Sequence, residues 1–185
     1  ALRLLLERAE GEGYEPPLDI RDENGQTALM LAAGGGAADV VQELLARSAD
    51  ANVTDDDGST ALHLAAAELW TGCMAALADA GVHVNLENAD GFTPLLLATG
   101  ARDLETFDEE TGATKLTIPP RDTAETEAAR LAAVQVLLRA GAKPVHMKSV
   151  HMVYPLVAAV SHASMSVVKA LLQARAEPYR RVIGY

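Results

Sequence analysis

The sequence predicts an all-α solenoid, a stack of similar helical units along one chain. Three observations favour this class: a motif that recurs every 33 residues, apolar helical runs after each copy, and a composition suited to an aliphatic core. The 185 residues are 49% hydrophobic but only 4% aromatic. The core therefore has to be built mainly from Leu, Val and Ala.

The recurring motif occupies Gly25–Leu29, Gly58–Leu62 and Gly91–Leu95, which read GQTAL, GSTAL and GFTPL. An apolar run follows each copy, such as MLAA after the first and HLAA after the second. A second helical pattern comes next, VVQELL in the first unit and VQVLL in the third. A stripe formed by Leu29, Leu31, Leu44 and Leu45 is too apolar for one unit to bury, so stacking has to supply the burial.

The ends of the expected helices carry their own signals. A threonine stands where a helix N-cap is needed in every copy, at Thr27, Thr60 and Thr93. Pro94 follows at the first helical position, where its missing N–H costs nothing. Glycines are expected in a left-handed conformation where helices end, at Gly36, Gly81 and Gly141.

These residues resemble the ankyrin repeat, in which a β-turn finger precedes two antiparallel helices. The resemblance implies about four stacked repeats. We expect an incomplete N-terminal repeat and loop (1–21), repeats at 22–54, 55–86 and 87–144, a degenerate repeat at 145–178 and a tail (179–185). Asp19 falls in the phase of Asn52 and Asn85. Because the chain starts directly in a helical pattern without Met, we expect it to be a piece of a longer polypeptide.

The third repeat contains a long insertion. Thr93 and Leu137 are 44 positions apart, against 17 between the matching Thr27 and Leu44. The 27 extra residues are assigned to 101–127, and loops of this length are usually functional or disordered. Alternating residues at 104–107 and 115–118 are compatible with a short hairpin, and the second helix is expected to start near 123–126. A mobile acidic loop and an element that grips a neighbouring subunit remain alternatives.

Charge and chemistry exclude several functions. The 26 acidic and 15 basic residues give a net charge of −11, which disfavours nucleic-acid binding. Residues 1–144 carry −15 and residues 145–185 carry +4. No apolar run is long enough to insert directly into a membrane. Cys73, the only cysteine, is expected to be buried and suits an intracellular, reducing compartment, either the cytoplasm or an organelle interior.

No catalytic set was found, so we expect no enzyme activity and no cofactor. His63 stands where the ankyrin resemblance implies a structural histidine. The remaining metal suggestion is a group of histidines in and near the last repeat, His146, His151 and His162. Two loop histidines and one helical histidine form a weak ligand set.

The predicted function is that of a protein-interaction module, a scaffold or accessory subunit. The resemblance places the partner surface on finger tips and first helices. The candidate contact residues are Glu23, Asn24, Gln26, Asp56, Asp57, Ser59, Glu68, Trp70, Asp90 and Phe92. Phe92 is expected to be an exposed apolar anchor among acids. Trp70, next to Leu69, is expected to form a second contact on the outer edge near the insertion, or to be covered by the insertion.

The expected partner is a protein with a basic or mixed apolar-basic surface, within a larger complex. The alternatives are a regulatory ankyrin segment of a longer enzyme or channel, and a metal- or small-molecule-binding protein that uses the histidines of the last repeat.

Overall fold

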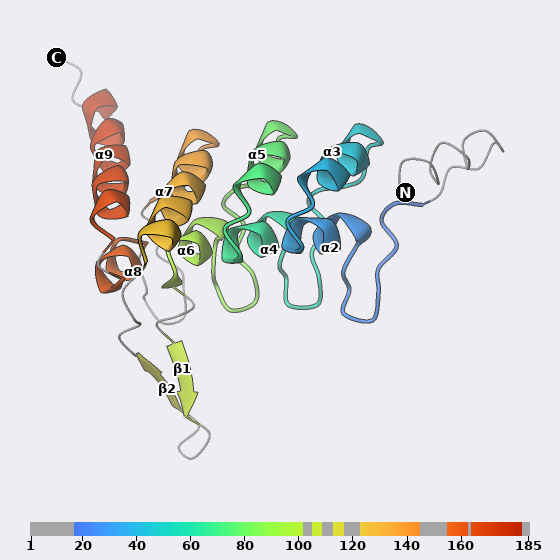
Figure 1. The fold of residues 1–185 in the computed structure, drawn as a ribbon, viewed down its shortest axis with the longest axis horizontal. Helices are drawn as coiled ribbons and strands as arrows, with labels where there is room; N and C mark the ends of the chain where they lie inside the picture. The colour runs from blue at the N-terminus through green and yellow to red at the C-terminus, as the bar shows by residue number, and fades with distance from the viewer. Residues whose placement is uncertain are drawn as a thin grey trace.

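The structure is a computed structural model, and it describes residues 17–101, 105–108, 113–116, 123–144, 155–162 and 164–182. Within these ranges the helices form four pairs arranged in two rows (Figure 1). The first helix of each pair lies in one row: α2 (Ala28–Gly34), α4 (Ala61–Ala67), α6 (Pro94–Ala98) and α8 (Pro155–Ser161). The second lies in the other row: α3 (Ala38–Ala46), α5 (Thr71–Asp79), α7 (Ala124–Arg139) and α9 (Met165–Val182).

Each helix packs on the equivalent helix of the next pair as well as on its own partner. In the first row α4 contacts both α2 and α6, and in the second row α5 contacts both α3 and α7. The finger loops project from the side of the first helices (Figure 1). The predicted all-α solenoid is therefore confirmed.

The predicted helix caps are confirmed. The Thr27 hydroxyl accepts a hydrogen bond from the Met30 N–H, and the Thr93 hydroxyl accepts one from the Leu96 N–H. Pro94 is the first residue of α6. Because a capping side chain satisfies a backbone donor that has no partner within the helix, each threonine fixes where its helix begins.

The core repeats the same positions from pair to pair. Val41 and Leu44 on α3 are buried, as are Met74 and Leu77 on α5, and Val134 and Leu137 take these positions on α7. Of the predicted stripe, Leu29 is buried and Leu45 is partly buried. The prediction was wrong for Leu31, which is 54% exposed.

The exposure of Leu31 follows from the direction in which its position faces. In the next repeat the equivalent Leu64 lies against Gly34 of the preceding one: a Cβ added to Gly34 would be 3.6 Å from the Leu64 Cβ. Leu64 is half-buried, and the equivalent Leu97 of the third repeat is buried. Leu31 has no such neighbour among the described residues, so this position is covered only where a repeat precedes it.

A second set of links joins the loops that follow the second helices. The Asp19 carboxylate accepts from the Asp50 N–H at 3.0 Å, and the Asn52 side chain accepts from the His83 N–H at 3.0 Å. Asn85 does the same for the Lys143 N–H at 2.8 Å. The shared phase of Asp19, Asn52 and Asn85 therefore corresponds to a shared role in joining each repeat to the next.

The insertion includes a β-hairpin, which Figure 1 places on the side of the finger loops. Strands β1 (Glu105–Asp108) and β2 (Ala113–Leu116) are antiparallel, and Glu105 pairs with Leu116. Strand β1 begins one residue later than the sequence predicted, and strand β2 begins two residues earlier. Residues 102–104, 109–112 and 117–122 of the insertion lie outside the described residues.

The last residues of the insertion are helical, and helix α7 starts within the predicted range 123–126. Helices α3 and α5 begin six residues before Leu44 and Leu77, whereas α7 begins thirteen residues before the equivalent Leu137. About two turns of the extra sequence therefore lengthen α7 at its N-terminal end. The N-cap of this helix is Thr123. The Glu127 carboxylate accepts hydrogen bonds from the backbone and hydroxyl of Ser166 at the start of α9.

The far end of the array also differs from the prediction. Helix α9 runs on to Val182, past the expected repeat boundary at 178 and into the expected tail. Earlier second helices end before Ser48, Gly81 and Gly141, all with positive φ. Arg175 takes this place in α9 and provides no such stop. Residues 145–154, with which this repeat was predicted to begin, lie outside the described residues. The N-terminal segment 1–16 lies outside them as well.

Two deletions separate the loop from the helical extension. Removing 103–121 and rejoining the chain with a short Gly-Ser turn is expected to leave the solenoid folded, because loop length has only a weak entropic effect. Removing 103–127 also deletes the N-cap and Glu127, so we expect the fourth repeat to melt first. Thermal unfolding followed by circular dichroism distinguishes the two. Equal melting curves for both deletions would show that Glu127 does not hold α9.

Candidate functional site

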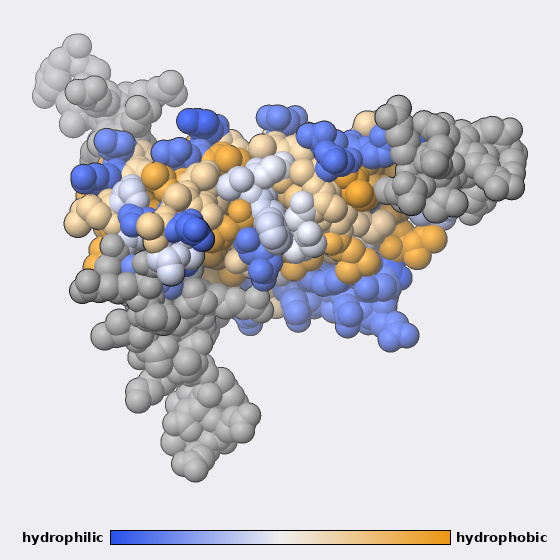
Figure 2. All heavy atoms as spheres, in the orientation of Figure 1, coloured by the Kyte–Doolittle hydropathy of each residue, from blue (hydrophilic) through white to orange (hydrophobic). Residues whose placement is uncertain are grey.

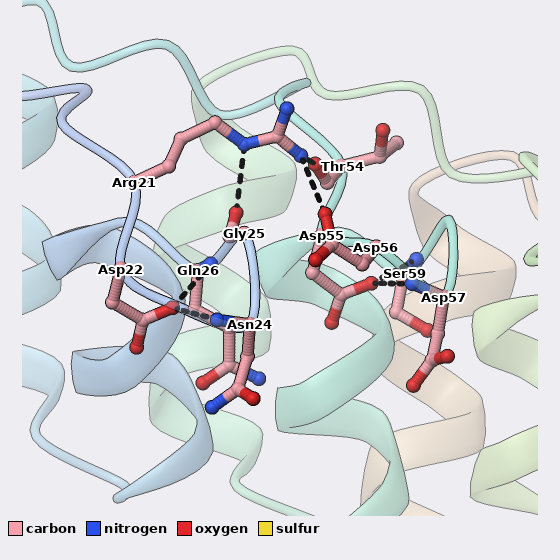
Figure 3. A network of polar contacts seen from close by, with 10 residues as sticks. All are labelled: Arg21, Asp22, Asn24, Gly25, Gln26, Thr54, Asp55, Asp56, Asp57 and Ser59. Atoms are coloured by element: carbon pink, nitrogen blue, oxygen red, sulfur yellow. Dashed lines mark hydrogen bonds and ion pairs between the residues drawn. The ribbon is translucent and has the colours of Figure 1, made fainter.

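The finger loops are built on one carboxylate or amide each. Figure 3 shows the first two fingers. The Asp22 carboxylate accepts from the backbone N–H groups of Asn24 and Gln26 at 2.9 and 2.8 Å. Asp55 binds the N–H groups of Asp57 and Ser59 in the same way, at 3.1 and 2.7 Å. These acids therefore shape the turns, a role typical of Asp and Asn in tight turns.

The third finger uses an amide for the same purpose. The Asn88 side-chain oxygen accepts from the Phe92 N–H at 2.9 Å, and its NH₂ group donates to the Ser59 hydroxyl at 3.2 Å. Sequence reasoning missed the roles of Asp22, Asp55 and Asn88. The signal was present, because an Asp or Asn stands three residues before the motif glycine in all three units.

Neighbouring fingers are joined through their backbones. The Asp56 N–H donates to the Asn24 carbonyl at 3.2 Å, and the Ala89 N–H donates to the Asp57 carbonyl at 2.8 Å. The Arg21 guanidinium adds a side-chain link, because it donates to the carbonyls of Gly25 and Thr54 and lies 3.9 Å from the Asp56 carboxylate. The three fingers therefore form one continuous edge, which we call the finger edge (residues 21–26, 54–59 and 87–92).

Most of the predicted contact residues lie exposed on this edge or beside it. Exposed are Glu23, Asn24, Asp56, Asp57, Glu68 and Asp90, and Gln26 is half-buried. In Figure 3 the Asp57 carboxylate points away from its finger and carries no marked contact. Figure 2 shows hydrophilic residues gathered along the finger side of the first repeats. The finger edge therefore presents its acids outward and in register.

Two of the predicted contact residues are buried. Phe92, expected as an exposed anchor, is 5% exposed and belongs to the apolar core cluster, within a segment (91–101) that is buried throughout. Its ring is buried because an aromatic side chain gains more from the core than from water. Ser59 is also buried, since its hydroxyl accepts from Asn88 and its N–H binds Asp55. The predicted exposure of Phe92 was therefore wrong, and Ser59, a candidate contact residue, is not on the surface either.

Trp70 is 44% exposed, but it already has a structural partner. Its indole N–H donates to the Gly34 carbonyl at 2.9 Å. The ring lies so close to Gly36 that an added Cβ there would be 2.7 Å from it, and Gly36 also has a φ of 75°. Leu69 takes the expected glycine position with a φ of 58°. Trp70 therefore packs on the turn of the first repeat.

His63 joins the second repeat to the third finger. Its Nδ1 accepts from the Thr60 N–H at 3.1 Å, which completes a capping box on α4. Its Nε2 donates to the carbonyls of Leu86 and Phe92 at 3.0 and 3.1 Å. Burial lowers the pKa of His63 below the ordinary 6.5, against the opposing effect of these two carbonyls. The neutral imidazole is the form that makes all these contacts.

The fourth repeat contains a buried polar contact at the base of the insertion. The His162 Nε2 donates to the Gly100 carbonyl at 3.1 Å, and Arg130 donates to the Ala98 carbonyl at 3.2 Å. A Cβ added to Gly100 would be 2.4 Å from His162 and 2.5 Å from Arg130, so only glycine fits there. His162 is thus engaged in holding the end of α6.

The other candidates for chemistry take structural places. Within the described residues no group of three or more His, Cys, Asp or Glu side chains could hold a metal ion, and His146 and His151 lie outside those residues. Cys73 is buried on α5, and burial raises the pKa of its thiol. A thiol with a raised pKa is a poor nucleophile. No helix in the described ranges is both long and apolar enough to cross a membrane.

The repeated fingers, caps and helix pairs define the class of the protein. The ankyrin-repeat family model (ankyrin repeats, many copies) matches residues 12–65. The same finger and cap geometry continues beyond this match, through the third unit at Asn88–Phe92 and Thr93. The chain therefore contains ankyrin repeats. No curated protein matches it. Ankyrin repeats in general are protein–protein interaction modules that bind along their extended surface.

The lowered pKa of His63 predicts a loss of stability in acid. The unfolded chain takes up a proton at this residue below pH 6.5, but the folded chain does not until the pH is lower. The His63 contribution to the free energy of unfolding is therefore present above pH 6.5 and decreases as the pH falls. Urea unfolding across this range should give a shallower decrease for His63→Gln than for the wild type. His83→Gln, at an exposed residue, is the control, and identical pH profiles for wild type and His63→Gln would contradict the assignment.

Proposed function

We propose that this ankyrin-repeat protein is a scaffold or accessory subunit whose finger edge binds a basic or mixed apolar-basic surface of a partner protein. The observation that carries the proposal is the outward, in-register display of Glu23, Asp56, Asp57 and Asp90 on fingers joined to one another. A partner that meets such an edge finds charges whose positions are already fixed. Preorganisation of this kind reduces the entropy that binding has to overcome.

The charge around the finger edge supports a basic partner. Residues 17–91 contain thirteen acidic and two basic residues, and the two bases are Arg21 and Arg47. Both lie next to acids of the same chain: Arg21 near Asp56, and Arg47 bound to Glu43 at 2.8 Å. The first repeats therefore produce a negative field that attracts basic surfaces and raises the rate of encounter with them.

The acidic residues of the fingers have two different roles, and this difference defines the proposed binding residues more closely. Asp22 and Asp55 use their carboxylates to hold finger N–H groups, so we assign them to the structure of the edge. Asp57, which directly precedes the motif glycine, directs its carboxylate outward (Figure 3). Asp90 takes the equivalent place on the third finger. With Phe92 in the core, apolar contact falls to exposed residues of the first helices such as Leu31.

The proposal assigns no reaction and no cofactor to the chain. We place its work in an intracellular, reducing compartment, because its single buried thiol has no disulfide partner in the sequence.

Charge reversal on the finger edge tests the proposal. A partner is first identified by crosslinking mass spectrometry from native extract, and its association rate is then measured at several salt concentrations. Asp56→Lys, Asp57→Lys and Asp90→Lys together should slow association and reduce its salt dependence, because the steering field is lost. The matched control reverses three exposed acids on second helices, Asp39, Asp79 and Glu125.

The control should associate faster than the finger-edge variant, although it carries the same net charge. If the finger-edge variant binds like the wild type, or if the control loses as much binding as the finger-edge variant, the finger edge is not the interface. Circular dichroism of both variants establishes that each is folded before the rates are compared.

A further inference from the structure

Trp70 occupies a backbone position that does not require an aromatic side chain. It is the N-cap of α5, with φ −74° and ψ 78°. The equivalent residue of the first repeat, Ala37, is the N-cap of α3, with φ −82° and ψ 73°. Alanine and tryptophan therefore serve the same turn in neighbouring repeats, and the indole ring of Trp70 is available for a role beyond that turn.

One face of the indole ring is covered by the first repeat. A Cβ added to Gly36 would lie 2.7, 2.8 and 2.9 Å from the ring atoms Cδ2, Cε2 and Cε3. Only a point above the ring plane can be almost equally distant from these three bonded atoms without overlapping the ring, so Gly36 faces the flat side. The N–H edge of the ring is bound to the Gly34 carbonyl at 2.9 Å. The 44% of Trp70 that stays exposed therefore includes the opposite face, which we call the open face.

These two contacts hold the ring in one orientation. The hydrogen bond fixes the edge that carries Nε1, and the close approach of Gly36 fixes the plane. An aromatic side chain that is already ordered loses little conformational entropy on binding, and tryptophan is among the residues that contribute most to protein interfaces. The open face of Trp70 is therefore preorganised for contact with a partner.

The surroundings of the open face are acidic. Glu68 is exposed in the same turn, two residues before Trp70, so the Cα atoms of the two residues lie within about 7.6 Å of each other. Asp39 is exposed in the first turn of α3, which packs on α5. Residues 48–101 contain eight acidic residues and neither lysine nor arginine. The second repeat therefore supplies no such cation to the ring, and its negative field attracts one from outside.

A flat aromatic face beside a carboxylate suits an arginine side chain. The guanidinium group is planar and stacks on aromatic rings, and its positive charge is attracted by the negative face of the ring. Its N–H groups can bind a carboxylate at the same time. Trp70 and Glu68 offer both interactions within one turn.

We propose that Trp70 and Glu68 form a binding site for an arginine side chain of a partner protein. The guanidinium stacks on the open face of the indole ring and bonds to the Glu68 carboxylate. The site follows α4, whereas the fingers precede it, and a helix of seven residues is about 10 Å long. The site and the finger edge therefore lie at opposite ends of this helix, and the proposal does not depend on the finger edge.

Fluorescence titration of the 185-residue chain tests the proposal, because Trp70 is its only tryptophan. The probe is an acetylated and amidated peptide in which three arginines alternate with two glycines. In the matched control peptide each arginine is replaced by citrulline, which has the same shape but no charge. The arginine peptide should change the emission of Trp70 and reach saturation, whereas the citrulline peptide should leave the emission unchanged.

Two variants test the role of the carboxylate. Glu68→Gln should weaken the binding that the Trp70 emission reports by about two- to fivefold, because an exposed ion pair is lost. Asp79→Asn is the control, since it removes one exposed acid from α5 in the same repeat. It should bind the arginine peptide like the wild type, and equal weakening by both variants would show that only the general field matters and overturn the site.

A third measurement tests the ring itself against a purely structural role. Trp70→Ala is expected to fold, because Ala37 serves the same turn, and circular dichroism checks this. Anisotropy of a fluorescein-labelled peptide gives its affinity, measured together with Asp56→Lys, Asp57→Lys and Asp90→Lys so that the finger edge does not contribute. Trp70→Ala should weaken binding of the arginine peptide about two- to fivefold and leave binding of the citrulline peptide unchanged.

Four results overturn the proposal. An emission that neither peptide changes shows that the chain itself covers the open face. An equal change with both peptides shows that the ring does not select a cation. If the emission change disappears in the variant with three lysines on the finger edge, Trp70 only responds to binding elsewhere. Equal affinities with and without Trp70→Ala show that the ring makes no contact with the peptide.

Discussion

The structure depends on one constraint: a single helix pair of this chain cannot bury its own apolar faces. Helix α4 has seven residues and α6 has five, too short to be stable in isolation. Their burial comes from the neighbouring pairs, since α4 packs between α2 and α6. Side chains such as Leu62 and Leu95 are therefore buried by the array and not by their own repeat. Stability is a property of adjacent repeats taken together.

Hydrogen bonds between neighbouring repeats fix the position of each repeat relative to the next within this apolar stack. They occur at both edges of the array: backbone bonds from Asp56 and Ala89 join the fingers, and Asp19, Asn52 and Asn85 join the loops after the second helices. Apolar packing alone tolerates sliding, whereas hydrogen bonds between fixed backbone groups do not. The finger edge inherits this register, which is why its outward acids stand at regular intervals along one surface.

The sequence was sufficient to predict the features that repeat. Residues like Thr27, Gly81 and Asn52 recur at the same position in other repeats. When every repeat needs the same side chain for the same role, that role can be recognised from the sequence pattern. Features that depend on place in the array could not be predicted in this way. Leu31 and Leu97 share one sequence position, yet one is exposed and the other buried. Glu127 belongs to the repeat that carries the insertion, where the regular pattern no longer fixes the length of the second helix.

The most direct test of shared stability is hydrogen–deuterium exchange of the Leu62→Ala variant. Leu62 is buried on α4, so the truncation weakens the contacts that α4 makes with both neighbours. The account predicts faster amide exchange not only in α4 but also in α2 and α6, with a smaller effect in α9 at the far end of the array. Faster exchange confined to α4, or a uniform increase along the whole chain, would contradict stability shared between adjacent repeats.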